Sequence, residues 1–131
     1  MESFGWAWVG FTLALAVHVA DEAAHDFLSF YNPAVRAIRV RLPFLPLPVF
    51  TFARWIGGLI AGIALLLLLS PLAFEGNSAL RLIAWPLAII IGLGNGLLHL
   101  IGSAWYRRWL PGTYSAPLML LAGLWLLGAA R

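Results

Sequence analysis

Apolar residues fill four stretches of the chain, and short polar or proline-rich segments separate them. The stretches cover about residues 4–27, 49–69, 79–105 and 114–130. A helix needs ~20 residues to cross the hydrocarbon core of a bilayer, which is about 30 Å thick. The pattern therefore predicts an all-α fold, a four-helix transmembrane bundle that forms one domain over residues 1–131.

The connector between the first two stretches is rich in proline. It holds Asn32-Pro33 and then three prolines between residues 42 and 48. Proline has no backbone N–H and its ring clashes inside a helix, so this density of prolines argues against a continuous helix. Three arginines in the same connector favour a segment that lies at the membrane surface.

The composition agrees with lipid as the solvent. Hydrophobic residues make up 63% of the chain and charged residues only 10%, against about 25% in an ordinary soluble domain. The chain has no cysteine, which excludes disulfides, thiolate zinc sites and iron–sulfur clusters.

The arginines carry an orientation signal. The net charge of +3 comes from eight arginines without any lysine, and most of them lie at predicted helix ends. We therefore expect both termini outside, the two basic connectors in the cytoplasm, and no nucleic-acid partner. Arginine in place of lysine, with much alanine, leucine and glycine, is typical of GC-rich bacterial genomes, so a multi-pass protein of the bacterial inner membrane is expected.

Five polar side chains interrupt the end of the first stretch: His18, Asp21, Glu22, His25 and Asp26. On a helix, His18, Glu22 and His25 fall within ~60° of one another. A charged side chain at the bilayer centre costs about 2.5–3.5 kcal/mol on insertion scales. These residues are therefore expected to face the bundle interior or the nearby water interface, with Asp26 as an ordinary end charge.

The third stretch carries polar residues that match this group. Asn95 and His99 are four residues apart and share one helix face. Gly92 and Gly96 share much of that face and let a neighbouring backbone approach closely. Because the first and third helices run in the same direction, His99 is expected at the same depth as the first polar group.

These side chains are of metal-ligating types. His18 and Glu22 at i,i+4, and Glu22 and His25 at i,i+3, can share an ion, and the second spacing resembles the half-site of di-iron bundle proteins. His18 and His25 lie about 10 Å apart along the axis, which favours one ion held by a subset, or two ions. Zinc, iron and manganese all suit such donors. The predicted ligands are His18, Glu22, His25, Asn95 and His99.

A structural alternative stays open. A buried network of histidine, carboxylate and arginine can lock helices together without any ion. With an ion present, Asp21 or Arg54 would instead bond to the ligands and orient them without contacting the ion. Gly58 and Gly62 form a small-xxx-small pattern, for which a packing role is expected.

The polar residues resemble the HXXEE family of small integral membrane proteins. The naming motif is present as His18-Val-Ala-Asp21-Glu22, with aspartate in place of the first glutamate. Similar blocks follow in order, namely Asn95 with His99, then Tyr106, then Pro111-Gly112-Thr113-Tyr114-Ser115-Ala116. The blocks together cover most of the chain. The resemblance implies a helical membrane protein with a polar or metal site, and it assigns no reaction.

Three functions fit these residues. The first is a membrane-embedded, metal-dependent enzyme, a hydrolase or oxidoreductase, that acts on a lipid-like or other hydrophobic small molecule, with Glu22 or Asp21 as ligand or acid/base. Three histidines are few for a di-iron hydroxylase and suit a zinc hydrolase better.

The second function is a metal-free isomerase in which Glu22 and His99 move a proton across an apolar pocket rimmed by Trp55 and Phe52. The third is a non-enzymatic protein that binds haem or a metal, or conducts ions. Four short helices make a poor pore alone, so transport would need a homo-oligomer. Membrane lipid is an expected partner in all three cases.

Overall fold

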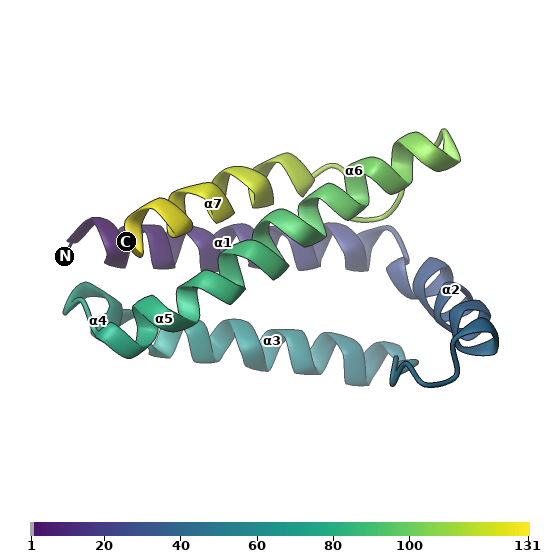
Figure 1. The fold of residues 1–131 in the computed structure, drawn as a ribbon, viewed down its shortest axis with the longest axis horizontal. Coiled ribbons are helices and arrows are strands. Elements are labelled where there is room, and N and C mark those ends of the chain that lie inside the picture. Colours follow the sequence, from purple (N-terminus) through teal and green to yellow (C-terminus); the bar gives the residue numbers. More distant parts are fainter. Residues whose placement is uncertain (1) are drawn as a thin grey trace.

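The computed structural model describes residues 2–131, and all of its regular elements are helices (Figure 1). Four long helical segments run up and down beside one another. They are α1 (Glu2–Ala24), α3 (Phe52–Leu68), the continuous run of α5 (Ser78–Pro86), η1 (Leu87–Gly94) and α6 (Asn95–Tyr106), and α7 (Ala116–Ala129). Both chain ends lie at the same end of the molecule (Figure 1). The predicted all-α class is therefore confirmed, and the two ends of the chain lie together as the up-and-down order of four helices requires.

The first connector contains a helix that was not expected. The backbone of Asp26 is left-handed, with φ 55°, and turns the chain from α1 into α2 (Phe27–Arg41). Pro33 lies inside α2, so the expectation that the prolines forbid a helix here was wrong for this part of the connector. A single proline forfeits one backbone bond, and the helix tolerates it. The closely spaced prolines that follow are non-helical, as predicted.

Asn32 ties this connector back to the bundle. Its Nδ2 donates to the Phe50 carbonyl at 2.8 Å, and its Oδ1 accepts from the Phe50 N–H at 3.0 Å. Tyr31 donates from its hydroxyl to the Pro48 carbonyl at 3.1 Å. These bonds hold the first half of α2 against the segment that leads into α3.

The third predicted helix is continuous but not uniform. Asn77 caps its start by accepting from the N–H groups of Ala79 and Leu80. The middle part, η1, is a wider π-helix that begins directly after Pro86. π-Helical turns are rare and often occur at functional sites. Regular α-helix resumes at Asn95, which keeps Asn95 and His99 on one face.

The backbones of η1 and α7 approach each other closely at two glycines. A Cβ on Gly92 would lie 2.8 Å from the Cα of Gly123, so the two backbones are in direct contact there. The predicted close approach at Gly92 is confirmed. A Cβ on Gly58 or Gly62 would meet nothing within 4 Å, so the described chain shows no packing role for that pair.

The apolar core fills the half of the bundle that holds the termini. Its largest fully buried side chains are Trp8, Phe4, Phe11, Met119 and Leu126. The indole N–H of Trp8 donates to the Leu66 carbonyl at 2.8 Å and joins α1 to α3. The core leaves His18, Glu22 and His99 in the other half of the bundle, next to α2.

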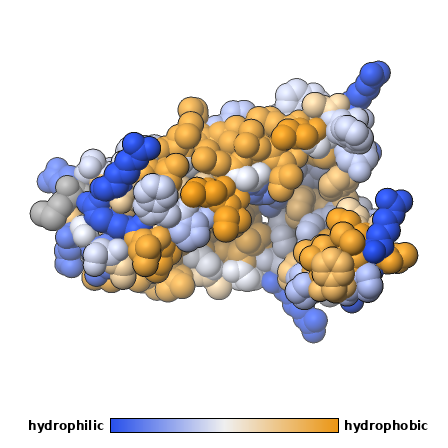
Figure 2. All heavy atoms as spheres, viewed as in Figure 1, coloured by the Kyte–Doolittle hydropathy of each residue, from blue (hydrophilic) through white to orange (hydrophobic). Residues whose placement is uncertain are grey.

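Two helical segments are long and apolar enough to cross a membrane, Glu2–Ala24 with 23 residues and Ser78–Tyr106 with 29. α3 and α7 have only 17 and 14 residues, or about 26 Å and 21 Å at 1.5 Å per residue. On the face shown in Figure 2, hydrophilic atoms gather toward the two ends of the long axis and apolar atoms cover much of the middle. Crossing by all four helices therefore stays a prediction.

Candidate metal centre

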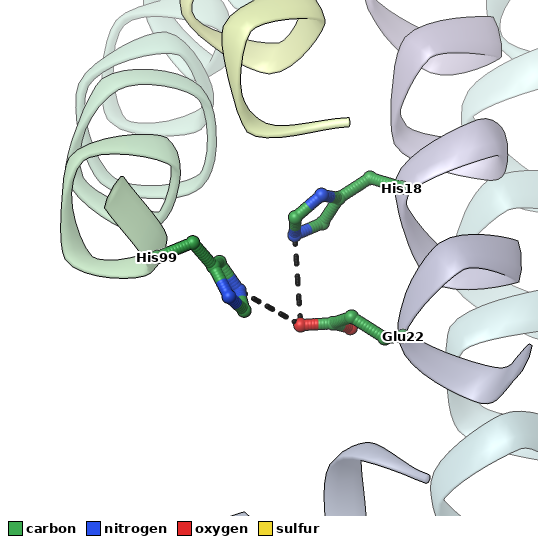
Figure 3. Close-up of side chains that lie close together, drawn as sticks. All are labelled: His18, Glu22 and His99. Carbon is green, nitrogen blue, oxygen red and sulfur yellow. Dashed lines mark ion pairs between the residues drawn. The ribbon is translucent and has the colours of Figure 1, made fainter. Parts of the chain in front are cut away.

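Three predicted ligands meet at one buried point. His18 and Glu22 come from α1 and His99 comes from α6, and Figure 3 shows both imidazoles directed at the Glu22 carboxylate. The Nε2 atom of His99 lies 3.0 Å from Glu22 Oε1, and the Nε2 atom of His18 lies 3.5 Å from the same oxygen. The residues are only 1%, 6% and 7% exposed for His18, Glu22 and His99. A ligand atom from each lies within 4.8 Å of the other two.

The predicted spacing explains how these side chains converge. His18 and Glu22 are one helical turn apart, so both project from the same face of α1. The two imidazole rings meet edge to face, with centroids 4.8 Å apart. His99 is 77 positions after Glu22 in the sequence and still meets it. This agrees with the prediction that His99 lies at the same depth as the polar residues of the first helix.

The turn before α7 packs against the imidazole ring of His99. Gly112 has φ +85°, a left-handed conformation that favours glycine. A Cβ at this position would lie 2.6 Å from Cε1 and 2.8 Å from Nδ1 of the His99 ring. The imidazole therefore packs directly on the Gly112 backbone, and no larger residue fits there without moving the ring.

Ser115 supports His18 in a similar way. Its Oγ lies 2.7 Å from His18 Nδ1 and 2.7 Å from Asp21 Oδ2, and its backbone N–H donates to the same Asp21 oxygen at 2.9 Å. Asn95 completes the surroundings, with Nδ2 2.9 Å from His18 Nε2. Asn95 thus contacts His18 beside the cluster, and its role as a ligand stays a prediction.

The structure does not bring His25 to the cluster. Its side chain is 51% exposed, and its Nδ1 lies 2.8 Å from Asp21 Oδ1 and 2.8 Å from the Asp21 carbonyl oxygen. Because Asp21 offers partners one turn earlier, the ring of His25 folds back on its own helix instead of reaching Glu22. His25 therefore leaves the predicted ligand set. Asp26 is exposed, as expected, and Arg54 is exposed too and does not support the site.

An apolar cavity opens onto the cluster. It has a volume of about 490 Å³ and lies between α1, α3 and η1, with His18, Glu22 and Asn95 in its wall. Much of the remaining wall is aromatic and is formed by Phe27, Tyr31, Phe50 and Trp55. A second hollow of about 320 Å³ reaches His99 and Asn95 and shares Phe27 and Tyr31 with the first.

Phe27 lies where these spaces meet. Its ring stacks on Trp55 and Tyr31, with centroids 5.8 Å and 5.4 Å away, and is tilted against His99 at 5.9 Å. Of the two carboxylates predicted to be catalytic, Glu22 lines the large cavity and Asp21 lines none of the described ones. Asp21 lies instead behind His18, bonded to Ser115.

Sequence reasoning missed three residues of this site: Phe27, Gly112 and Ser115. Phe27 was placed at the end of the first helix, with no reason to turn inward. Gly112 and Ser115 both belong to the Pro111–Ala116 block that resembled the HXXEE pattern. That block was the available signal, because a short loop segment that matches a family pattern more often serves a site than a core.

Comparison with known proteins identifies the family. A family model described as "Protein of unknown function with HXXEE motif" matches residues 8–126. The match covers most of the chain, including all of the cluster, so the chain belongs to this family. No curated protein and no solved structure matches the chain.

Proposed function

We propose that this HXXEE-family protein is a membrane-embedded, metal-dependent enzyme that acts on a lipid-like or other hydrophobic small molecule. The observation that carries the proposal is the buried group of His18, Glu22 and His99 in the wall of an apolar cavity. Burying a carboxylate among apolar side chains is costly unless it is paired, so a carboxylate and two imidazoles at one such point favour a cation between them. The cavity walls suit an apolar substrate.

The donor set fits a divalent transition metal. Zinc bound at about 2.0–2.1 Å in a tetrahedral site needs ligand atoms about 3.3 Å from one another. Glu22 Oε1 lies 3.0 Å from His99 Nε2 and 3.5 Å from His18 Nε2, close to this value, and the three ligand atoms lie within 4.8 Å of one another. Two histidines and one carboxylate are the ligands of several catalytic zinc sites and also of non-haem iron sites. We propose zinc or iron, and favour hydrolysis over oxidation because of the small number of histidines.

The chain itself would contribute binding, orientation and exclusion of water. When bound, the ion would act as a Lewis acid and activate a water molecule. His18, Glu22 and His99 would hold the ion, and two of them, His18 and Glu22, also line the cavity. The aromatic wall of Phe27, Tyr31, Phe50 and Trp55 would orient the apolar part of the substrate and keep bulk water out.

A metal-free isomerase is the second candidate, and one observation favours it. Glu22 and His99 are within hydrogen-bonding distance at 3.0 Å beside the cavity, which is the geometry for moving a proton. Trp55 lines that cavity as predicted, whereas Phe52 packs on Trp55 outside it. This candidate differs from the first in one testable respect, since its activity would survive chelators.

Haem does not fit between the two histidines. A porphyrin held by both rings would have to lie between them, where their centroids are only 4.8 Å apart. Glu22 Oε1 already contacts both imidazoles at that point. A haem-binding role would therefore require the cluster to be dismantled.

The membrane context belongs to the same proposal. We place all four long segments in the bilayer of the bacterial inner membrane, with α2 at the lipid–water boundary. Large exposed apolar side chains on all four support this placement, including Leu13, Ile60, Leu98 and Leu121. Membrane lipid would then surround the bundle and deliver an apolar substrate sideways. A homo-oligomer stays a prediction.

Elemental analysis of gently extracted protein tests the proposal. We expect close to one zinc or iron per chain in the wild type, and loss of the metal in His18→Ala and in His99→Ala. His25→Ala is the matched control, because His25 lies on the same helix but outside the cluster, and this variant should keep its metal. A wild type without metal, or equal loss in all three variants, would remove the metal-dependent function.

A further inference from the structure

The hydrogen bonds around Ser115 determine which nitrogen of His18 carries the proton. The backbone N–H of Ser115 can only donate, so Asp21 Oδ2 accepts this bond. The Ser115 hydroxyl lies 2.7 Å from the same carboxylate oxygen and has one proton to give. A carboxylate oxygen can only accept, so a contact of this length requires the hydroxyl to donate its proton to Asp21 and not to His18. The Ser115 oxygen then has only lone pairs left for His18.

His18 must therefore be the donor of its 2.7 Å bond to Ser115, with the proton on Nδ1. In a neutral imidazole this leaves Nε2 unprotonated. The surroundings of Nε2 agree, since the amide nitrogen of Asn95, a donor, lies 2.9 Å away. Nε2 is also the atom that faces Glu22 Oε1 at 3.5 Å. Nε2 has one lone pair, so a cation bound between it and the Glu22 oxygen would replace the Asn95 N–H as its partner.

We infer that Asp21 and Ser115 are positioning residues, which together hold His18 in the tautomer and orientation needed to bind a metal through Nε2. Metal-bound histidines commonly donate their second N–H to a carboxylate or another acceptor, which orients the ring and raises its basicity as a ligand. In this protein the acceptor is the Ser115 hydroxyl, which in turn donates to the Asp21 carboxylate.

The arrangement also joins separate parts of the chain at the site. Asp21 and His18 lie on α1, while Ser115 is the residue directly before α7. The Ser115 side chain is 94% buried, its exposed fraction being 6%. The turn that precedes α7 thus supports both imidazoles of the cluster, His99 through Gly112 and His18 through Ser115. This gives the aspartate of the family motif in this chain a role that does not require contact with a substrate.

The tautomer of His18 can be measured without any metal. Nitrogen NMR of metal-free protein labelled with [¹⁵N]histidine separates protonated from unprotonated ring nitrogens. The chain has three histidines, and the pair of signals missing in His18→Gln belongs to His18. We expect Nδ1 protonated and Nε2 unprotonated in the wild type. The reverse assignment would overturn the inference.

Zinc affinity supplies the second measurement, and this part rests on the proposed metal site. Competition with a chromophoric chelator should show that Ser115→Ala binds zinc about 10–100-fold more weakly than wild type, the usual effect of removing a partner behind a ligand. Ser115→Thr keeps the hydroxyl and should restore most of the affinity.

Ser103→Ala is the matched control for a general loss of structure. Ser103 also makes partly buried hydrogen bonds in this region, to Thr113 at 2.5 Å and to the Leu110 N–H at 3.0 Å, but no hydrogen bond to His18. It should bind zinc as the wild type does. Full affinity in Ser115→Ala, or equal losses in Ser115→Ala and Ser103→Ala, would overturn the inference. If the wild type binds no zinc, the proposed function fails, and the tautomer measurement alone decides on the role of Ser115.

Discussion

Replacing Gly112 with alanine should disable the cluster without touching a ligand. The new Cβ would lie 2.6–2.9 Å from three atoms of the His99 ring. Ordinary contacts are about 3.4–4 Å, so the ring or the turn must move by roughly 1 Å. Because the turn is held by bonds from Ser115 and Thr113, we expect His99 to move and its Nε2 to leave Glu22.

Two separate costs follow from this substitution. The left-handed backbone of Gly112, at φ +85°, costs alanine about 1–2 kcal/mol of folding free energy. Removing a residue that hydrogen-bonds to a metal ligand weakens metal binding by up to about 100-fold, or about 2.8 kcal/mol. Displacing the ligand His99 itself should weaken zinc binding at least as much. The assay is zinc affinity by chelator competition, measured beside the thermal unfolding midpoint in detergent.

Gly76→Ala separates the two costs. Gly76 has φ +74° in the turn between α4 (Ser70–Phe74) and α5, at the opposite end of the molecule from the cluster (Figure 1). This variant should lose similar stability and keep its zinc affinity. If Gly112→Ala binds zinc as tightly as Gly76→Ala does, the packing of His99 on the turn does not position the ligand, and the reasoning is refuted.

Three further predictions concern the fold. Gly92→Ala places a Cβ 2.8 Å from the Gly123 backbone and should lower stability by about 1–3 kcal/mol, whereas Gly58→Ala, with open space around it, should be neutral or stabilising by about 0.5–1 kcal/mol; equal thermal midpoints for the two would contradict the packing described. Trp8→Phe removes the 2.8 Å bond to the Leu66 carbonyl and should cost about 1 kcal/mol in the same measurement, and no change would show that this bond does not stabilise the bundle. Because the chain has no cysteine, Glu75→Cys and Arg39→Cys can be labelled selectively in intact vesicles; we expect them to react from opposite sides, and reaction from the same side would exclude a crossing by α3.

The central residues of the site could be predicted because their placement depends on helix geometry. The i,i+4 spacing of His18 and Glu22 puts both on one face of α1, and the common direction of the first and third helices puts His99 at the same depth. The face of α1 that a residue occupies is set by local helix geometry, and the depth of His99 is set by the up-and-down order of the helices. Neither depends on the loops or on side-chain packing.

His25 lies outside the cluster because the same geometry does not describe competition between partners. Its spacing from Glu22 suits a shared ion, but Asp21, one turn earlier, offers its side chain and its backbone carbonyl at 2.8 Å. Ser115 could not be predicted for a different reason. Its role depends on how the turn before α7 folds back onto α1, and a contact across 94 residues leaves no periodic trace in the sequence.

The connector was misjudged where a single proline was given too much weight. Pro33 lies inside α2, while the segment around Pro43 and Pro46 is non-helical as expected. The left-handed turn at Asp26 that starts α2 carries no strong sequence signal, since aspartate adopts this conformation only occasionally. That turn brings Phe27 over the cluster, so of the aromatic wall only Trp55 could be foreseen from the sequence.

Anomalous diffraction from crystals grown with zinc tests the central claim most directly. We predict one strong peak per chain, bound by Nε2 of His18, Nε2 of His99 and the carboxylate of Glu22, with His25 too far away to contribute. Crystals that contain zinc but show no peak among these three side chains would contradict the account, and His18, Glu22 and His99 would then be a hydrogen-bonded network that joins α1 to α6.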